Sequence, residues 1–321
     1  MIISIGGSVS TGSTPWINIV SAYEDVRVLE GELRIGESGL YNIASQIYAQ
    51  ETPTKDEFLE VKKSLIGFGQ KIPTASRLAF SLLLRLPGAP PSIIHKVNQY
   101  RSGKRSYDKR LPGFSLYSKN MLKELELFLN EADSLETATR NLKIQKLMDT
   151  YFSSLEKCVS NDKKVVIDQL ITPRLLFDER YGCVISDILS DVKIIVVRRD
   201  PRDQFIDLLL KKKKRYHTMQ PSEAASCFVN EYLPRYERMS AMLENCDPNK
   251  IADVWFEDIF FDFEAALSKL ESFTGLRKRP TAFNCFDFSD AFLKVKMHES
   301  EAFAKETNFI KDRMRRHLYR Y

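Results

Sequence analysis

The hydrophobic pattern opens with a short apolar run that leads directly into a turn rich in glycine and hydroxyl residues. The run Ile2–Ile5 has the length and composition of a buried strand, and the spacing after Gly12 is helical. This helical pattern continues from Trp16 to Ala22. The pattern therefore predicts a strand, a tight turn and a helix at the start of the chain.

Three further runs are typical of short buried strands, at residues 26–29, 164–167 and 192–197. Residues 194–197 are all β-branched, which suits a parallel strand covered on both faces. Helical spacing follows residue 200 and returns at 263–274, where Gly275 ends the helix. Alternation of such strands and helices predicts an α/β protein of three layers with a central parallel sheet.

The section from about residue 40 to 160 has a different pattern, with apolar and charged residues alternating at helical spacing. Two polar or proline-rich breaks interrupt it, at residues 86–92 and 101–113. We predict a large, mostly helical insertion here that forms the acceptor or lid region. The whole chain, residues 1–321, is then expected to be a single domain.

Composition and charge exclude several classes of protein. The net charge of +5 suits anionic ligands but is too small to indicate nucleic-acid binding. The five cysteines lie far apart with no C-x-x-C pair, so we interpret them as reduced thiols. No run is long enough for a membrane span and none resembles a signal peptide, which predicts a cytoplasmic protein. The sequence does not indicate an oligomeric state.

The first turn has the spacing of a phosphate-binding loop, Gly7-x4-Gly12-Ser13-Thr14, with Ser13 where a kinase-type loop carries lysine. Backbone N–H groups and the positive end of a helix dipole converge on an anion at such a turn. Without the lysine, a metal-bound triphosphate is not the expected ligand. The residues expected to bind the anion are Gly7, Ser8, Ser10, Thr11, Gly12, Ser13 and Thr14.

Together with two later segments, the loop resembles the sulfotransferases that use 3′-phosphoadenosine-5′-phosphosulfate (PAPS). The later segments are Ile194–Asp203, with an Arg-Arg-Asp-Pro motif at its end, and Val254–Leu267, with an aromatic-Glu-Asp motif. An apolar-Thr-Gly-Leu turn at Phe273–Leu276 completes the pattern. The resemblance covers both ends of the chain and leaves residues 40–160 outside. It implies a P-loop-like fold and an enzyme that transfers a sulfonate group without a metal. The acceptor would be a hydroxyl or amine of a small molecule or glycan, here expected to be a carbohydrate.

The resemblance also implies roles for individual residues. The loop would hold the 5′-phosphosulfate, and Arg199 would grip the 3′-phosphate with the planar fork that lysine cannot copy. A basic C-terminal segment would cover that phosphate, with Lys294 and Arg313 as candidates. Glu32 would be the base for the acceptor proton, with Glu30 as its rival.

Two positions depart from the family pattern. The family has a lysine at or near Ser10, and here Arg34 or the C-terminal basic segment would have to supply that charge. The family also places a serine at the position of Asp207, where an ionised carboxylate would repel a phosphate. We therefore expect a shifted helix register, compensation by Lys211 or Arg202, or a different donor.

Two other functions are compatible with the sequence. A metal-dependent phosphotransferase would use Asp168, which follows a predicted strand, as its magnesium ligand. A non-catalytic relative would keep only the anion recognition of the loop.

Overall fold

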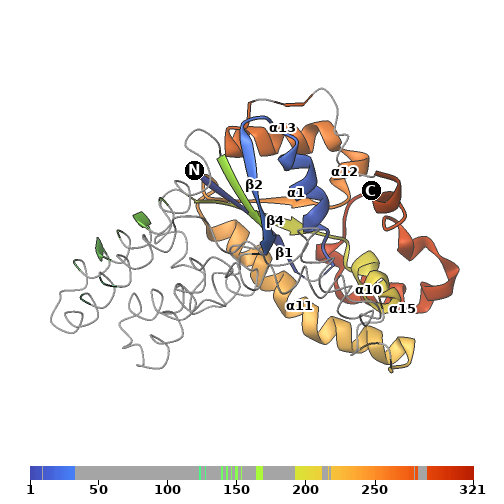
Figure 1. Ribbon diagram of the computed structural model, residues 1–321. Coiled ribbons are helices and arrows are strands. Elements are labelled where there is room, and N and C mark those ends of the chain that lie inside the picture. Colours follow the sequence, from blue (N-terminus) through green and yellow to red (C-terminus); the bar gives the residue numbers. More distant parts are fainter. Residues whose placement is uncertain are drawn as a thin grey trace, which may run out of the picture. The chain divides into compact units, whose positions relative to one another are not determined.

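We analysed a computed structural model of the chain. It describes residues 1–8, 10–32, 164–168, 192–211, 216, 218–277, 279–280 and 288–321, with isolated helical positions between 123 and 153. Figure 1 shows these elements as ribbons.

The chain divides into two compact units. The strands of one unit are β1 (Ile2–Gly7), β4 (Val192–Arg198) and β5 (Ile251–Trp255), adjacent in the order β1-β4-β5. Those of the other are the neighbours β2 (Val26–Glu32) and β3 (Lys164–Asp168). β4 and β5 pair in parallel, in a register that places Arg198 opposite Trp255. The carboxyl ends of these two strands therefore meet at one edge of the sheet.

The helices of the described residues are α1 (Ser13–Ser21), α10 (Pro201–Leu210), α11 (Pro221–Asn245), α12 (Asp258–Phe261), α13 (Phe263–Thr274), α14 (Phe288–Phe292) and α15 (Ala304–Arg313). Short 3₁₀ turns at Met297–Glu299, Glu301–Phe303 and Arg315–His317 complete the C-terminal segment.

The unit that contains β1, β4 and β5 has helices on both sides of its strands. α1 and α13 lie on one side and α11 lies on the other (Figure 1). The indole of Trp16 in α1 is fully buried and donates a hydrogen bond to the Trp255 carbonyl oxygen at 3.0 Å. The Tyr23 hydroxyl donates to Glu271 of α13 at 2.8 Å. The first contact holds α1, and with it the loop that precedes it, against β5, and the second joins the residues after α1 to α13.

The predicted α/β class with a parallel sheet is confirmed, with differences in two helical segments. The helical stretch expected after Asp200 consists of α10 and α11, and Pro221 begins the second helix because its fixed φ suits a first turn. The helix predicted at 263–274 is α13, closed by Gly275, and the aromatic-Glu-Asp motif opens a separate short helix, α12, which ends where Asp262 has a non-helical φ of −147°. Most of the expected helical insertion lies outside the described residues. The single-domain boundary stays a prediction.

A search of the described part of the chain for a helix long and apolar enough to span a bilayer finds none.

Candidate anion-binding site

The predicted loop lies between the end of β1 and the start of α1, as its spacing indicates. Gly12 is the N-cap of α1 and has a φ of 84°, in the left-handed region that favours glycine. Ser10 also has a positive φ, 63°, which costs a serine about 1 kcal/mol. Strained backbone of this kind tends to persist at ligand sites. The local geometry therefore agrees with an anion-binding turn.

Close contacts within the loop and with Phe256 fix the conformation of the loop. The hydroxyl of Thr11 donates to the Ser8 carbonyl oxygen at 2.8 Å. A Cβ on Gly7 would lie 1.9 Å from that hydroxyl oxygen, and one on Gly12 would lie 2.4 Å from the Phe256 ring. Packing thus requires glycine at both positions, and at Gly12 the left-handed backbone conformation requires it as well. Phe256, the aromatic residue of the aromatic-Glu-Asp motif, therefore packs directly on the loop.

The start of α1 is open to an anion. No side chain caps it and its first turn contains no acidic residue. The first N–H groups of a helix have no partner within the helix, and the helix dipole adds partial positive charge at that end. The described residues therefore form a cradle that fits the phosphosulfate end of the expected donor.

Arg199 lies at the end of β4, where the sequence predicted it, but its guanidinium is bound to protein groups. Its side chain is only 2% exposed. The guanidinium donates to the carbonyl oxygens of Ser10 at 2.8 Å and Lys294 at 2.6 Å, and pairs with Asp207 at 3.3 Å. It also stacks over the Phe256 ring, 5.0 Å from its centroid. Arg199 thus joins the loop to α10 and to the C-terminal segment.

Asp207 bridges Arg199 and a second cation. The Lys211 ammonium lies 2.6 Å from the Asp207 carboxylate and 3.4 Å from the Ser10 hydroxyl oxygen. Burial raises the pKa of Asp207, but the Lys211 hydrogen bond and the charge of Arg199 outweigh it and hold that pKa below its ordinary value. Asp207 is therefore ionised and neutralised at neutral pH. Of the two compensating residues expected, Lys211 contacts Asp207, whereas Arg202 forms a bidentate pair with Asp200.

The side chains of both C-terminal candidates are exposed. Lys294 contributes its carbonyl oxygen to Arg199, and its side chain is exposed. Arg313 is exposed at the end of α15, over the Phe309 ring at 5.6 Å. Their roles toward a phosphate stay predictions.

The predicted catalytic residues belong to the other unit. Glu30 and Glu32 lie in β2, but their side chains are outside the described residues, and so is Arg34 altogether. Among the described residues, no cluster of three or more His, Cys, Asp or Glu side chains is placed to hold a metal ion.

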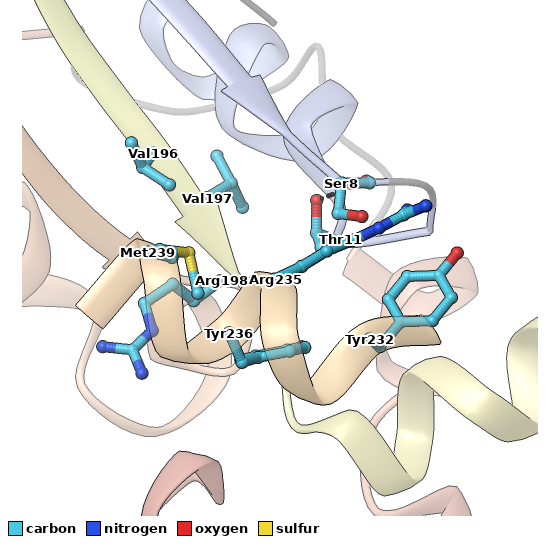
Figure 2. A pocket seen from close by; sticks show the side chains of 9 residues that line it. All are labelled: Ser8, Thr11, Val196, Val197, Arg198, Tyr232, Arg235, Tyr236 and Met239. Carbon is cyan, nitrogen blue, oxygen red and sulfur yellow. Dashed lines mark hydrogen bonds between the residues drawn. The ribbon is translucent and has the colours of Figure 1, made fainter. Parts of the chain in front are cut away.

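A small pocket adjoins the loop between the end of β4 and one face of α11 (Figure 2). Its empty volume is about 300 Å³, part of it open to solvent. The lining residues are Ser8, Thr11, Val196, Val197, Arg198, Tyr232, Arg235, Tyr236 and Met239. Beside the two loop residues, the lining thus combines aliphatic and aromatic side chains with two arginines, which the sequence did not indicate.

A parallel α/β sheet with a glycine- and hydroxyl-rich turn between its first strand and first helix is typical of proteins with a P-loop-like fold. A family model described as the sulfotransferase family matches residues 85–280, more than half of the 321 residues. The chain therefore belongs to the sulfotransferase family and is a transferase. The match includes Arg199, Asp207 and the aromatic-Glu-Asp motif, whereas the loop precedes it.

Two solved structures are similar to this chain. One is the sulfotransferase domain from the curacin biosynthetic pathway, with 13% identity over 98% of this chain and 97% of that chain, and a TM-score of 0.40. The other is the sulfotransferase domain from the Synechococcus PCC 7002 olefin synthase, with 14% identity over 96% of this chain and 86% of that chain, and a TM-score of 0.44. Among curated protein sequences, none matches the chain.

Proposed function

We propose that this protein transfers a sulfonate group from PAPS to a hydroxyl or amine of a small-molecule or glycan acceptor, with a carbohydrate as the expected class. The observation that carries the proposal is the uncapped start of α1 behind a strained, hydroxyl-rich loop. Such a site binds an anion through N–H groups and needs no metal to do so. Membership of the sulfotransferase family supports a sulfonate as the group transferred.

The residues of this chain would divide the work. The N–H groups from Gly12 to Thr14 and the hydroxyls of the loop bind and orient the phosphosulfate end. When bound, PAPS supplies a sulfur whose bond to the 5′-phosphate oxygen breaks as the acceptor oxygen or nitrogen bonds to it. Glu32 takes the acceptor proton, with Glu30 as the alternative base.

Arg199 is the residue whose proposed role needs a change in its present contacts. Its fork is held by Ser10, Lys294 and Asp207, so a 3′-phosphate would have to replace the Lys294 carbonyl oxygen or Asp207. The Nε atom of Arg199 is buried and has no hydrogen-bond partner among the described residues. An unsatisfied buried donor at this position favours an anionic ligand nearby. We retain Arg199 as the proposed 3′-phosphate residue on this basis.

A thermal-shift measurement tests the proposed donor. Adenosine 3′,5′-bisphosphate, the product of the donor, should stabilise the protein by about 2.7 kcal/mol at 100 times its dissociation constant. For a chain of this size the melting temperature should then rise by several degrees. ATP with magnesium is the matched control and should cause little change, because the loop has no lysine at Ser13 and the described residues offer no metal cluster.

The two ligands separate the proposal from its rivals. Stabilisation by ATP with magnesium alone would overturn the PAPS assignment and favour a phosphotransferase. Stabilisation by the bisphosphate without transfer to any of a panel of sugars and alcohols would instead favour a non-catalytic relative.

A further inference from the structure

We infer that Lys211, at the end of α10, is the cation that binds the 5′-phosphate in the loop, and that Asp207 positions it. This inference rests on the proposed function, because it concerns the same anion site. The loop itself provides only neutral donors, so an anion bound there would lack a full positive charge. Lys211 comes from a different element, and its ammonium lies 3.4 Å from the Ser10 hydroxyl oxygen, 201 residues away in sequence.

Exposure and orientation distinguish Lys211 from Arg199 as a partner of the anion. The Lys211 side chain is 46% exposed, whereas that of Arg199 is 2% exposed. Arg199 binds the carbonyl oxygen of Ser10, while Lys211 approaches its hydroxyl, a group on the side chain. An incoming phosphate can therefore reach Lys211 without breaking the buried contacts of Arg199.

Asp207 holds Lys211 at this position. The two residues are an i,i+4 pair, and the Asp207 carboxylate is itself nearly buried and paired with Arg199. One carboxylate between two cations leaves a net positive charge at the loop. An acidic residue that would repel a phosphate alone thus serves here to fix a lysine. A long side chain fixed in advance loses less entropy when the ligand binds.

The placement of Lys211 also suits the transfer step. As the bond from sulfur to the 5′-phosphate oxygen breaks, its electron pair stays on that oxygen, the acceptor atom bonds to sulfur, and the acceptor proton goes to the base. The negative charge that develops on the phosphate is stabilised by an ammonium beside the loop. No metal or further reactant is needed for this balance.

Calorimetric binding of two mononucleotides to the whole protein tests the inference. Lys211→Ala should bind adenosine 5′-monophosphate about 10- to 100-fold more weakly, the loss expected for one charge-assisted hydrogen bond. It should lose less affinity for adenosine 3′-monophosphate, because Lys211 approaches the Ser10 hydroxyl while Asp207 separates it from Arg199. Lys211→Arg keeps the charge and should retain most of the affinity for the 5′-monophosphate.

Lys269→Ala is the matched control. Lys269 also pairs with an aspartate, Asp253, at 3.0 Å, and Asp253 in turn pairs with Arg198. Lys269→Ala therefore disturbs an ion-pair network of the same kind, Lys269–Asp253–Arg198, that includes no residue of the loop. Lys269→Ala should bind both mononucleotides as the wild type does. Thermal unfolding of each variant shows whether it is folded.

Each result bears on a different claim. Unchanged affinity of Lys211→Ala for the 5′-monophosphate, or a loss confined to the 3′-monophosphate, overturns the role of Lys211 and leaves the donor assignment intact. Wild-type protein that binds the 3′,5′-bisphosphate no more tightly than the 5′-monophosphate overturns the PAPS donor, while a loss in Lys211→Ala still supports Lys211. Wild-type protein that binds neither 5′-phosphate ligand overturns both.

Discussion

Glu257 follows Phe256, whose ring packs on the loop, and is a buried acidic residue with an incomplete set of hydrogen bonds. Its side chain is fully buried, and one carboxyl oxygen accepts the Asp200 N–H at 2.8 Å. The other oxygen has no hydrogen-bond partner among the described residues. Burial, with the nearby charge of Asp200, raises the pKa of Glu257 to about 8. Glu257 is therefore largely protonated at neutral pH, so its carboxyl group also has a proton to donate.

This shift predicts a pH dependence of stability. Because the folded pKa lies above the unfolded value, Glu257 contributes fully below about pH 4.5 and its contribution is lost as the pH rises to about 8. Glu257→Gln removes the titrating group, so its free energy of unfolding should rise relative to that of the wild type as the pH increases. The relative change should be at most about 1.4 kcal/mol per pH unit in this interval. Urea unfolding at several pH values measures the difference.

The exposed residue Glu301 provides the control for this experiment. Glu301→Gln should follow the wild-type curve at every pH. Parallel curves for Glu257→Gln and the wild type between pH 5 and 8 would show that Glu257 is ionised in the folded protein.

Among the elements, the loop and β2 contribute to the proposed chemistry in different ways. The loop would bind its ligand through backbone groups, whose geometry depends on Gly7 and Gly12 and on the packing of Phe256. β2 would contribute side chains. It extends to Glu32, three residues beyond the apolar pattern, and residues two apart in a strand share a face. Glu30 and Glu32 therefore both remain candidates for the base.

Substitution of each glutamate in β2 separates the two candidates. Glu32→Gln should lower the rate of sulfonate transfer at least 100-fold, because a general base contributes 100- to 10,000-fold. Its affinity for adenosine 3′,5′-bisphosphate should be unchanged. Transfer of labelled sulfonate from PAPS to a panel of sugars and alcohols measures the rate. Glu30→Gln is the matched control, and the opposite result for the two variants would assign the base to Glu30.

In the unit that contains the loop, the carboxylate of Asp203 on α10 anchors the C-terminal segment through several hydrogen bonds. Asp203 is fully buried and accepts the N–H groups of Lys296 at 2.8 Å and His298 at 2.9 Å. It also contacts the His298 ring nitrogen at 2.7 Å and accepts from the Tyr321 hydroxyl at 3.1 Å. Burial raises the pKa of Asp203, but the hydrogen bond and charge of His298 outweigh it and lower that pKa overall.

Asp203→Asn should destabilise the protein by about 3 kcal/mol at neutral pH, because the amide nitrogen would face N–H donors in a buried site. Since the folded pKa is lowered, the contribution of Asp203 is present at neutral pH and lost as the pH falls through that value. The difference between variant and wild type should therefore shrink below about pH 4. Chemical unfolding measures both effects. The exposed Asp312→Asn on α15 should behave as the wild type, and equal stability of Asp203→Asn would exclude this anchoring role.

Short-range patterns accounted for the elements that frame the site. The strand, turn and helix at Ile2–Ser21 follow from local spacing and from the glycine at the helix start, and the structure has them at those positions. The β-branched run before Arg198 likewise predicted a buried parallel strand. The helix predicted at 263–274 is also present, whereas the short helix α12 before it was not predicted, because four residues are too few to show a helical period.

The sequence by itself determined the α/β class, the position of the candidate anion-binding loop and the motifs typical of sulfotransferases, because these depend on periodicity and spacing within short segments. Only the tertiary structure decided which charges face that loop. Arg199 is turned to protein groups, and Lys211 lies beside Ser10. These pairings join residues about 190 to 200 positions apart, so they depend on how β1, β4 and α10 pack together. Local pattern carries no information on that packing.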